Sequence, residues 1–169
     1  NVKGGEKEPL GPGMSGYGSV AGGMAEGKVT HRRESIVMLE CAFIMRDEFL
    51  RQGATVVMTR ETENRRFSNL ERDAVANEAG AHVMLRLHGD LNKNTQNRGH
   101  GVYYPVNSDY ARAVADTDTY RAYGQLILDA LNARNVGRTN KSTLEGTDRF
   151  VGNNWAMMPC FLVELGFMS

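Results

Sequence analysis

The chain has 169 residues, of which 41% are hydrophobic and 24% charged, a composition typical of one globular domain. Twenty basic and twenty acidic side chains cancel, so the net charge gives no reason to expect nucleic acid or anionic lipid as a partner. No apolar run approaches the roughly 20 residues of a membrane-spanning helix, so we expect no membrane span. Because the first residue is Asn1 rather than methionine, we expect a piece of a longer protein, in which a missing leader says nothing about compartment.

Residues 1 to about 27 are rich in glycine, proline and serine and show no hydrophobic period, which predicts an extended loop. Within them, residues 11–16 formally match the dinucleotide-binding pattern Gly-x-Gly-x-x-Gly. That pattern needs a strand before it and a helix after it, and the flanking residues predict neither. We therefore exclude a nucleotide site.

The next two helices have clear sequence signals. Apolar residues spread over a wide helical face predict a helix over 34–51, which Gly53 ends. The β-branched stretch 54–59 predicts a short buried strand. Ser68 and Glu71 form a capping box, which predicts a second helix running to about 79 and ending at Gly80.

In the second half, short apolar runs alternate with helical stretches. The pattern predicts strands at 81–88, 101–104 and 160–165, a polar loop at 92–98, a long helix from about 108 to 134, and a polar connection containing Gly146 and Gly152. This alternation indicates an α/β fold: a mostly parallel open sheet with helices on both faces, in a single domain spanning residues 1–169. Cys41 and Cys160 fall in a predicted helix and strand, which favours two free buried thiols over a disulfide.

Two charged residues sit where apolar strands should stay apolar. His88 closes the run that begins at Ala81, and Glu164 lies between Val163 and Leu165. A lone histidine at a strand end often just bonds to backbone, but a carboxylate in so apolar a run is rarely structural without an arginine partner. Since strand ends deliver residues to the ligand crevice of an open α/β sheet, both are active-site candidates.

The other candidates carry weaker signals. Glu34 opens the first helix, where an acid can simply favour the helix dipole. His31 lies three residues before it and could share a metal with it, although neighbouring basic residues oppose a cation. His100 is expected to be a surface strand residue. Asp148, Arg149 and Trp155 precede the last strand and could contact a substrate, but nothing in their pattern is specific for that role.

Several blocks of the sequence occur in one order: Glu34 at a helix start, then 53–60 (GATVVMTR), 69–77 (NLERDAVAN), 85–88 (LRLH), 98–99 (RG) before 102–104 (VYY), and 163–168 (VELGFM). Their order and spacing resemble the zinc-dependent N-acetylmuramoyl-L-alanine amidases of the Amidase_3 type. The resemblance covers nearly the whole chain from about residue 34 onward. Each block alone is a weak signal, whereas their joint order is specific.

The resemblance implies roles for three residues. In these enzymes two histidines and a glutamate bind one Zn²⁺, and a second glutamate in the last strand acts in catalysis. Glu34 matches the metal-binding glutamate, His88 the second histidine and Glu164 the catalytic glutamate. The implied substrate is peptidoglycan, cleaved at the amide joining the lactyl group of N-acetylmuramic acid to L-alanine of the stem peptide. The implied setting is extracytoplasmic, as for a secreted autolysin that degrades cell wall.

One departure from the family pattern leaves the first zinc-binding histidine open. The family carries it in an Asp-Pro-Gly-His-like motif after an apolar strand, and this sequence has neither. We favour the explanation that the chain starts after that strand, because the residues before Gly11 are too polar for a central strand. Alternatively, residues 11–14 are a degenerate motif with Met14, a poor zinc ligand, in place of histidine.

Two further readings compete with an active amidase. In one, the chain is a catalytically incompetent peptidoglycan-binding or regulatory module with an incomplete zinc site. In the other, His31 substitutes as the missing ligand. The sequence does not fix the stem-peptide preference, attached wall-binding domains or the oligomeric state.

Overall fold

The computed structural model describes residues 5–20, 25–63, 67–134 and 139–169. Its centre is a four-stranded sheet in the order β3-β6-β4-β5. The strands are β3 (Met84–Asp90), β4 (Gly101–Tyr104), β5 (Thr143–Gly146) and β6 (Cys160–Phe167). β3 runs parallel to β6 and β4 parallel to β5, while β4 and β6 are antiparallel. The predicted α/β class with a mostly parallel sheet is therefore confirmed.

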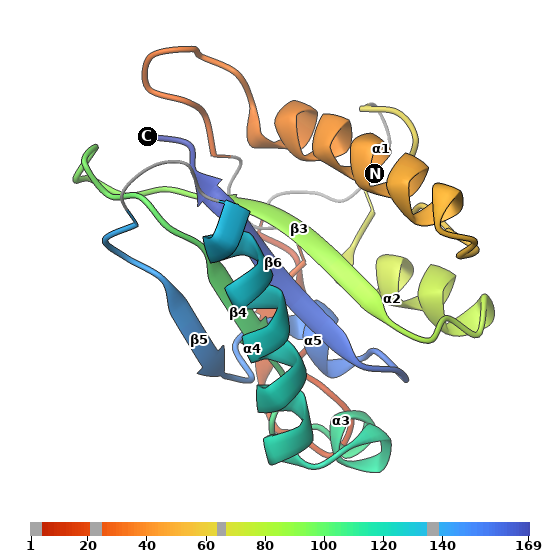
Figure 1. Cartoon of the computed structure of the whole chain (residues 1–169). Helices are drawn as coiled ribbons and strands as arrows, with labels where there is room; N and C mark the ends of the chain where they lie inside the picture. The colour runs from red at the N-terminus through yellow and green to blue at the C-terminus, as the bar shows by residue number, and fades with distance from the viewer. Residues whose placement is uncertain (1–4, 21–24, 64–66, 135–138) are drawn as a thin grey trace.

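Helices cover both faces of this sheet. α4 (Thr117–Arg134) lies across the front in Figure 1 and packs on β4 and β5. The main apolar core fills that interface with Val102, Tyr104, Tyr120, Leu128, Phe161 and Val163. The opposite face carries α2 (Asn69–Glu78) and α5 (Val151–Asn154), with a smaller cluster of Ala76, Met84, Ala156, Met158 and Cys160. Strand alternation thus sends neighbouring residues of β3 and β6 to different layers.

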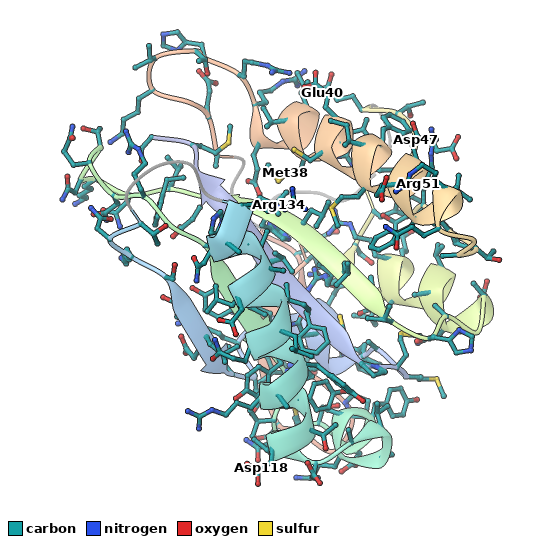
Figure 2. All side chains as sticks on the ribbon, in the orientation of Figure 1. Met38, Glu40, Asp47, Arg51, Asp118 and Arg134 are labelled. Atoms are coloured by element: carbon teal, nitrogen blue, oxygen red, sulfur yellow. The ribbon has the colours of Figure 1, made fainter. Side chains whose placement is uncertain are left out.

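α1 (Glu34–Arg51) forms as predicted and contacts β3. In Figure 2, Met38 points from this helix toward the sheet, whereas Glu40, Asp47 and Arg51 point away from it. Part of its apolar surface is nevertheless uncovered, since Phe49 and Leu50 are 40% and 50% exposed. The described part of the sheet ends at β3, so no strand lies beneath the far end of the helix.

Residues 54–59, predicted as a buried strand, form no strand, and Val57 is 55% exposed. The physical reason is the lack of a partner: among the described residues, no strand pairs with this β-branched stretch. The local sequence indicates which side chains suit a strand, but it does not show whether a second strand is present to form hydrogen bonds with it.

Four further features differ from the expectation. The predicted helix from about 108 to 134 is two helices, α3 (Asp109–Val114) and α4, because Ala115 is extended and Asp116 caps the second helix by accepting a bond from the Thr119 amide at 2.7 Å. The polar connection before the last strand contains β5 and α5. The last strand itself extends to Phe167, and β3 begins at Met84 rather than at Ala81. Both cysteines are free, as predicted, but only Cys160 is buried, whereas Cys41 is partly exposed.

The N-terminal stretch, expected to be an extended loop, contains an antiparallel hairpin of β1 (Lys7–Pro9) and β2 (Tyr17–Ser19). Glu8 of this hairpin is 7% exposed. Its carboxylate accepts bonds from the backbone amides of Asn69 and Leu70 at 3.2 and 3.1 Å, and from the Asn69 side chain at 3.0 Å. The hairpin therefore anchors the start of α2.

We expect Glu8→Ala to lower the free energy of unfolding by about 2 kcal/mol, because three donors at a buried helix start lose their acceptor. Urea denaturation of the variant beside wild type measures the change. Lys7→Ala, a change at the exposed neighbour of Glu8 on β1, serves as the comparison within the same hairpin. A Glu8→Ala midpoint equal to that of Lys7→Ala would contradict this role for the carboxylate.

Candidate functional site

The candidate site lies where β3 and β6 end, on the sheet face opposite α4. His88 and Glu164 are direct partners in the parallel β3–β6 ladder, so their side chains leave the sheet side by side on one face. The apolar neighbours of both residues point the other way into the core around α4. The sequence therefore places two polar side chains outward without disturbing the apolar core.

Glu34 reaches the same place from the first turn of α1. Its Oε1 lies 3.0 Å from His88 Nδ1 and accepts the Gly89 amide at 3.1 Å, while Oε2 accepts the Ala25 amide at 3.3 Å. Burial alone would raise the pKa of the Glu34 carboxyl, but the bonds from His88, Gly89 and Ala25 outweigh it and hold that pKa below its usual range. Glu34 is thus a fixed, ionised carboxylate beside an imidazole.

Glu164 has the opposite electrostatic setting. Its Oε2 is buried and has no hydrogen-bond partner among the described residues. Burial, reinforced by the charges of Asp90 and Glu34, raises the pKa of Glu164 to about 8. A cation held by Glu34 and His88 would pull that pKa down. The group is therefore placed to hold or release a proton near neutral pH.

Glu164 and Asp90 separate two cavities. One, of about 300 Å³, opens to solvent and is lined by Ala25, Glu34, His88, Gly89, Asp90, Leu91 and Glu164. The other, of about 60 Å³, is more enclosed and is lined by Asp90, Gly99, His100, Gly101, Tyr103, Lys141, Thr143, Glu164 and Phe167. The three predicted site residues thus meet in the larger pocket, with Glu164 shared between the two.

The donor pair can be tested against zinc from its own geometry. An imidazole nitrogen and a carboxylate oxygen are both zinc ligands, and bonds of about 2.0 Å at a tetrahedral angle would place the two donor atoms about 3.3 Å apart. The observed separation of 3.0 Å is close to that value. The part of the chain that the structure describes holds no group of three or more His, Cys, Asp or Glu side chains able to bind a metal. Glu34 and His88 therefore fit as part of a zinc site, and the described residues do not complete it.

Several weaker candidates lie elsewhere or have other partners. His31 pairs with Glu26 at 3.2 Å and does not line either cavity. Asp148 accepts the backbone amides of residues 106 and 107, both at 2.9 Å, and so holds a turn. The Trp155 indole donates to the Pro9 carbonyl at 2.9 Å. His100 is half-buried rather than on the surface, with its Nδ1 3.0 Å from the Leu165 carbonyl.

Sequence reasoning did not single out Asp90, Tyr103 or Lys141 as site residues, yet all three line a cavity with Glu164. Asp90 had a findable signal, since it lies two residues after His88 on the same strand. Tyr103 and Lys141 reach the site through the pairing of β4 with β6 and β5, which the sequence does not display.

Comparison with known protein families gives one assignment. The profile of the family described as N-acetylmuramoyl-L-alanine amidase matches residues 11–169. A comparison with curated proteins gives no significant match.

Solved structures share the fold. The N-acetylmuramyl-L-alanine amidase Ami1 from Mycobacterium smegmatis aligns with a TM-score of 0.72 at 20% identity, over 98% of this chain and 75% of that one. Ami1 from Mycobacterium abscessus, in its apo form, aligns with a TM-score of 0.74 at 19% identity, over 97% and 76%. An N-acetylmuramoyl-L-alanine amidase from Clostridium difficile 630 aligns with a TM-score of 0.71 at 23% identity, over 85% and 72%.

Proposed function

The chain belongs to the N-acetylmuramoyl-L-alanine amidase family, and on that premise we propose that it cleaves peptidoglycan by a zinc-dependent reaction. The bond is the amide between the lactyl group of N-acetylmuramic acid and L-alanine of the stem peptide. Glu34 and His88 hold the zinc, and Glu164 is the catalytic acid–base. The observation that carries this proposal is the convergence of these three side chains on one pocket of about 300 Å³.

Amide hydrolysis needs an activated water, a polarised carbonyl and a proton for the leaving nitrogen. Bound zinc would lower the pKa of a coordinated water toward 7 and polarise the carbonyl. The backbone amides of Gly89 and Ala25 donate to the Glu34 carboxylate and hold it in place, which suits a ligand, and its Oε1 lies 3.0 Å from His88 Nδ1, so both donor atoms would face one ion. Glu164, whose Oε2 is buried without a partner among the described residues, would take the proton of the attacking water and deliver it to the leaving nitrogen.

The proposed site of action is the cell wall outside the cytoplasm, where the enzyme would act as a secreted autolysin, since peptidoglycan is found there. None of the described helices is long and apolar enough to cross a membrane.

A second candidate is a peptidoglycan-binding or regulatory module that keeps the fold without catalysis. It is favoured by one observation: in the described residues, Glu34 and His88 lack a third metal-binding side chain beside them. This candidate predicts retention on insoluble peptidoglycan together with no zinc and no release of stem peptides.

Zinc content and peptide release distinguish the two. We expect the purified protein to contain zinc by elemental analysis and to release stem peptides from peptidoglycan. Glu34→Ala and His88→Ala should each lower the zinc affinity by more than about tenfold, because each removes a direct ligand. His82→Ala is the matched control, since His82 is an exposed imidazole six residues before His88. Equal zinc content in His88→Ala and His82→Ala would contradict the assignment, as would cleavage that survives a zinc chelator.

A further inference from the structure

Tyr103, Arg149 and Phe150 form a cationic and aromatic platform next to Glu164 that the proposed reaction does not use. In the antiparallel β4–β6 ladder, Gly101 is the partner of Glu164. Tyr103 lies two residues further along β4, so it shares the sheet face of Gly101 and Glu164. The platform therefore lies on the catalytic face of the sheet.

The Tyr103 ring lies next to the side chain of Glu164, the proposed catalytic residue. A side chain at Gly101 would meet both of them: its Cβ would lie 2.8 Å from Tyr103 Cε2 and 3.3 Å from Glu164 Cβ. Position 101 therefore suits only glycine, because a larger residue would collide with Tyr103 and crowd Glu164. Tyr103 and Glu164 also line the same enclosed cavity of about 60 Å³. A substrate group lying past Glu164 on this side therefore meets Tyr103 next.

Arg149 lies over this tyrosine. Its Cζ is 5.5 Å from the centroid of the Tyr103 ring and 5.3 Å from that of Phe150, and the two rings meet edge to face at 5.3 Å. Nη2 donates to Glu145 Oε2 at 2.9 Å, and the Arg149 side chain is 57% exposed. Two rings and a carboxylate thus hold a guanidinium that is still open to solvent. With five N–H donors in a rigid fork, a guanidinium held in this way is preorganised for a planar anion.

The charges around Glu164 are distributed unevenly. Glu34, Asp90 and Glu164 line the larger pocket, whose lining contains no lysine or arginine among the described residues, and Asp90 and Glu164 also line the smaller cavity. Cations occur on the β4–β5 side, where Lys141 lines the smaller cavity and Arg149 covers Tyr103. In peptidoglycan the N-acetylated backbone sugars are neutral, whereas the stem peptide carries free carboxylates. A carboxylate gains from a guanidinium and a neutral sugar does not, so the peptide half matches this side.

We propose that the platform of Tyr103, Arg149 and Phe150 binds a free carboxylate of the stem peptide, with Arg149 making the contact. This inference rests on the proposed function, because it places the leaving half of the same substrate. It orients that substrate with the peptide over β4 and β5 and the sugar on the side of Glu34 and His88. The protein would then distinguish stem peptides with a free carboxylate from those in which this carboxylate is amidated.

The test uses two soluble muramoyl peptides that differ only at the second residue of the stem, whose α-carboxyl is either a free carboxylate or a carboxamide. Steady-state kinetics and binding constants, the latter in a Glu164→Gln background that stops turnover, are measured for both. For Arg149→Ala we expect KM and Kd to rise about fivefold for the carboxylate peptide, with kcat nearly unchanged, and to stay unchanged for the carboxamide. Arg149→Lys should recover part of the loss because it keeps the charge.

Arg112→Ala is the matched control, because Arg112 is an arginine of similar exposure that is paired with Asp109 on α3. Equal losses on both peptides in Arg149→Ala would overturn the proposal, since a structural role does not distinguish them. It would also be overturned if the Glu164→Gln protein with Arg149 intact bound both peptides equally. Failure of the proposed function looks different: the wild type would then leave both peptides uncleaved, while the binding constants still report on the platform.

Discussion

Replacing Glu164 by glutamine is expected to lower kcat by about 10²- to 10⁴-fold while KM changes little, because glutamine keeps the shape of the side chain but cannot carry a proton between water and leaving nitrogen. The substitution also disturbs little of the surrounding structure. Its Oε2 makes no hydrogen bond within the described residues, and its ladder neighbours keep their backbone bonds in the variant. Release of stem peptides from peptidoglycan, followed by chromatography, measures the loss.

Zinc content is the internal check on this experiment. Glu164→Gln should retain the zinc of the wild type, since Glu34 and His88 contact each other rather than Glu164. An exposed carboxylate on α1, changed in Glu40→Gln, controls for the loss of one acidic group. Activity within about threefold of wild type in Glu164→Gln, with zinc bound, would remove Glu164 from the proton-transfer step.

Two of the three candidate site residues could be predicted from the sequence because of the energetic cost of their placement. A charged or polar side chain in an apolar strand is costly without a partner or a role, and His88 closes such a strand while Glu164 lies within one. Parallel strands bring their carboxyl ends to one edge of the sheet, so the two residues could be expected to meet. Glu34 was the weaker case, because an acid in the first turn of a helix has an ordinary structural explanation. Its link to His88 is a contact between residues 54 positions apart.

The parts that could not be predicted depend on long-range partners. Residues 54–59 have the side chains of a strand, but among the described residues no strand pairs with them. β5 is the reverse case: a polar, glycine-containing stretch becomes a strand because β4 lies beside it. Glu8 belongs to the same class, because nothing near it in the sequence shows that its carboxylate anchors α2.

A buried polar network under the site shows the same dependence on distant residues. Arg86 of β3 is 8% exposed and donates to Asn153 Oδ1 at 3.1 Å and to Asn69 Oδ1 at 2.7 Å. Asp73 of α2 is 1% exposed and is electrostatically coupled to Arg86. Burial nevertheless dominates and raises the pKa of Asp73 to about 8, so this carboxyl is mainly protonated at neutral pH. Asp73 therefore offers Arg86 little negative charge at neutral pH.

Arg86→Leu is expected to lower the free energy of unfolding by about 3–5 kcal/mol, the cost of removing one partner from a buried polar network. The Asn69 and Asn153 side chains would lose a donor in a place water does not reach, and Glu8, which shares Asn69 with Arg86, would lose a nearby positive charge. Arg86→Lys should recover only part of the loss, because a single ammonium does not reproduce the fork that spans the two amides. Urea denaturation monitored by circular dichroism measures the change.

Arg112→Ala, which removes an exposed arginine paired with Asp109 on α3, should cost less than about 0.5 kcal/mol. If Arg86→Leu were as stable as that control, the network would be incidental to the fold, and the packing of α2 and α5 against the sheet would have to rest on the apolar cluster around Cys160 alone.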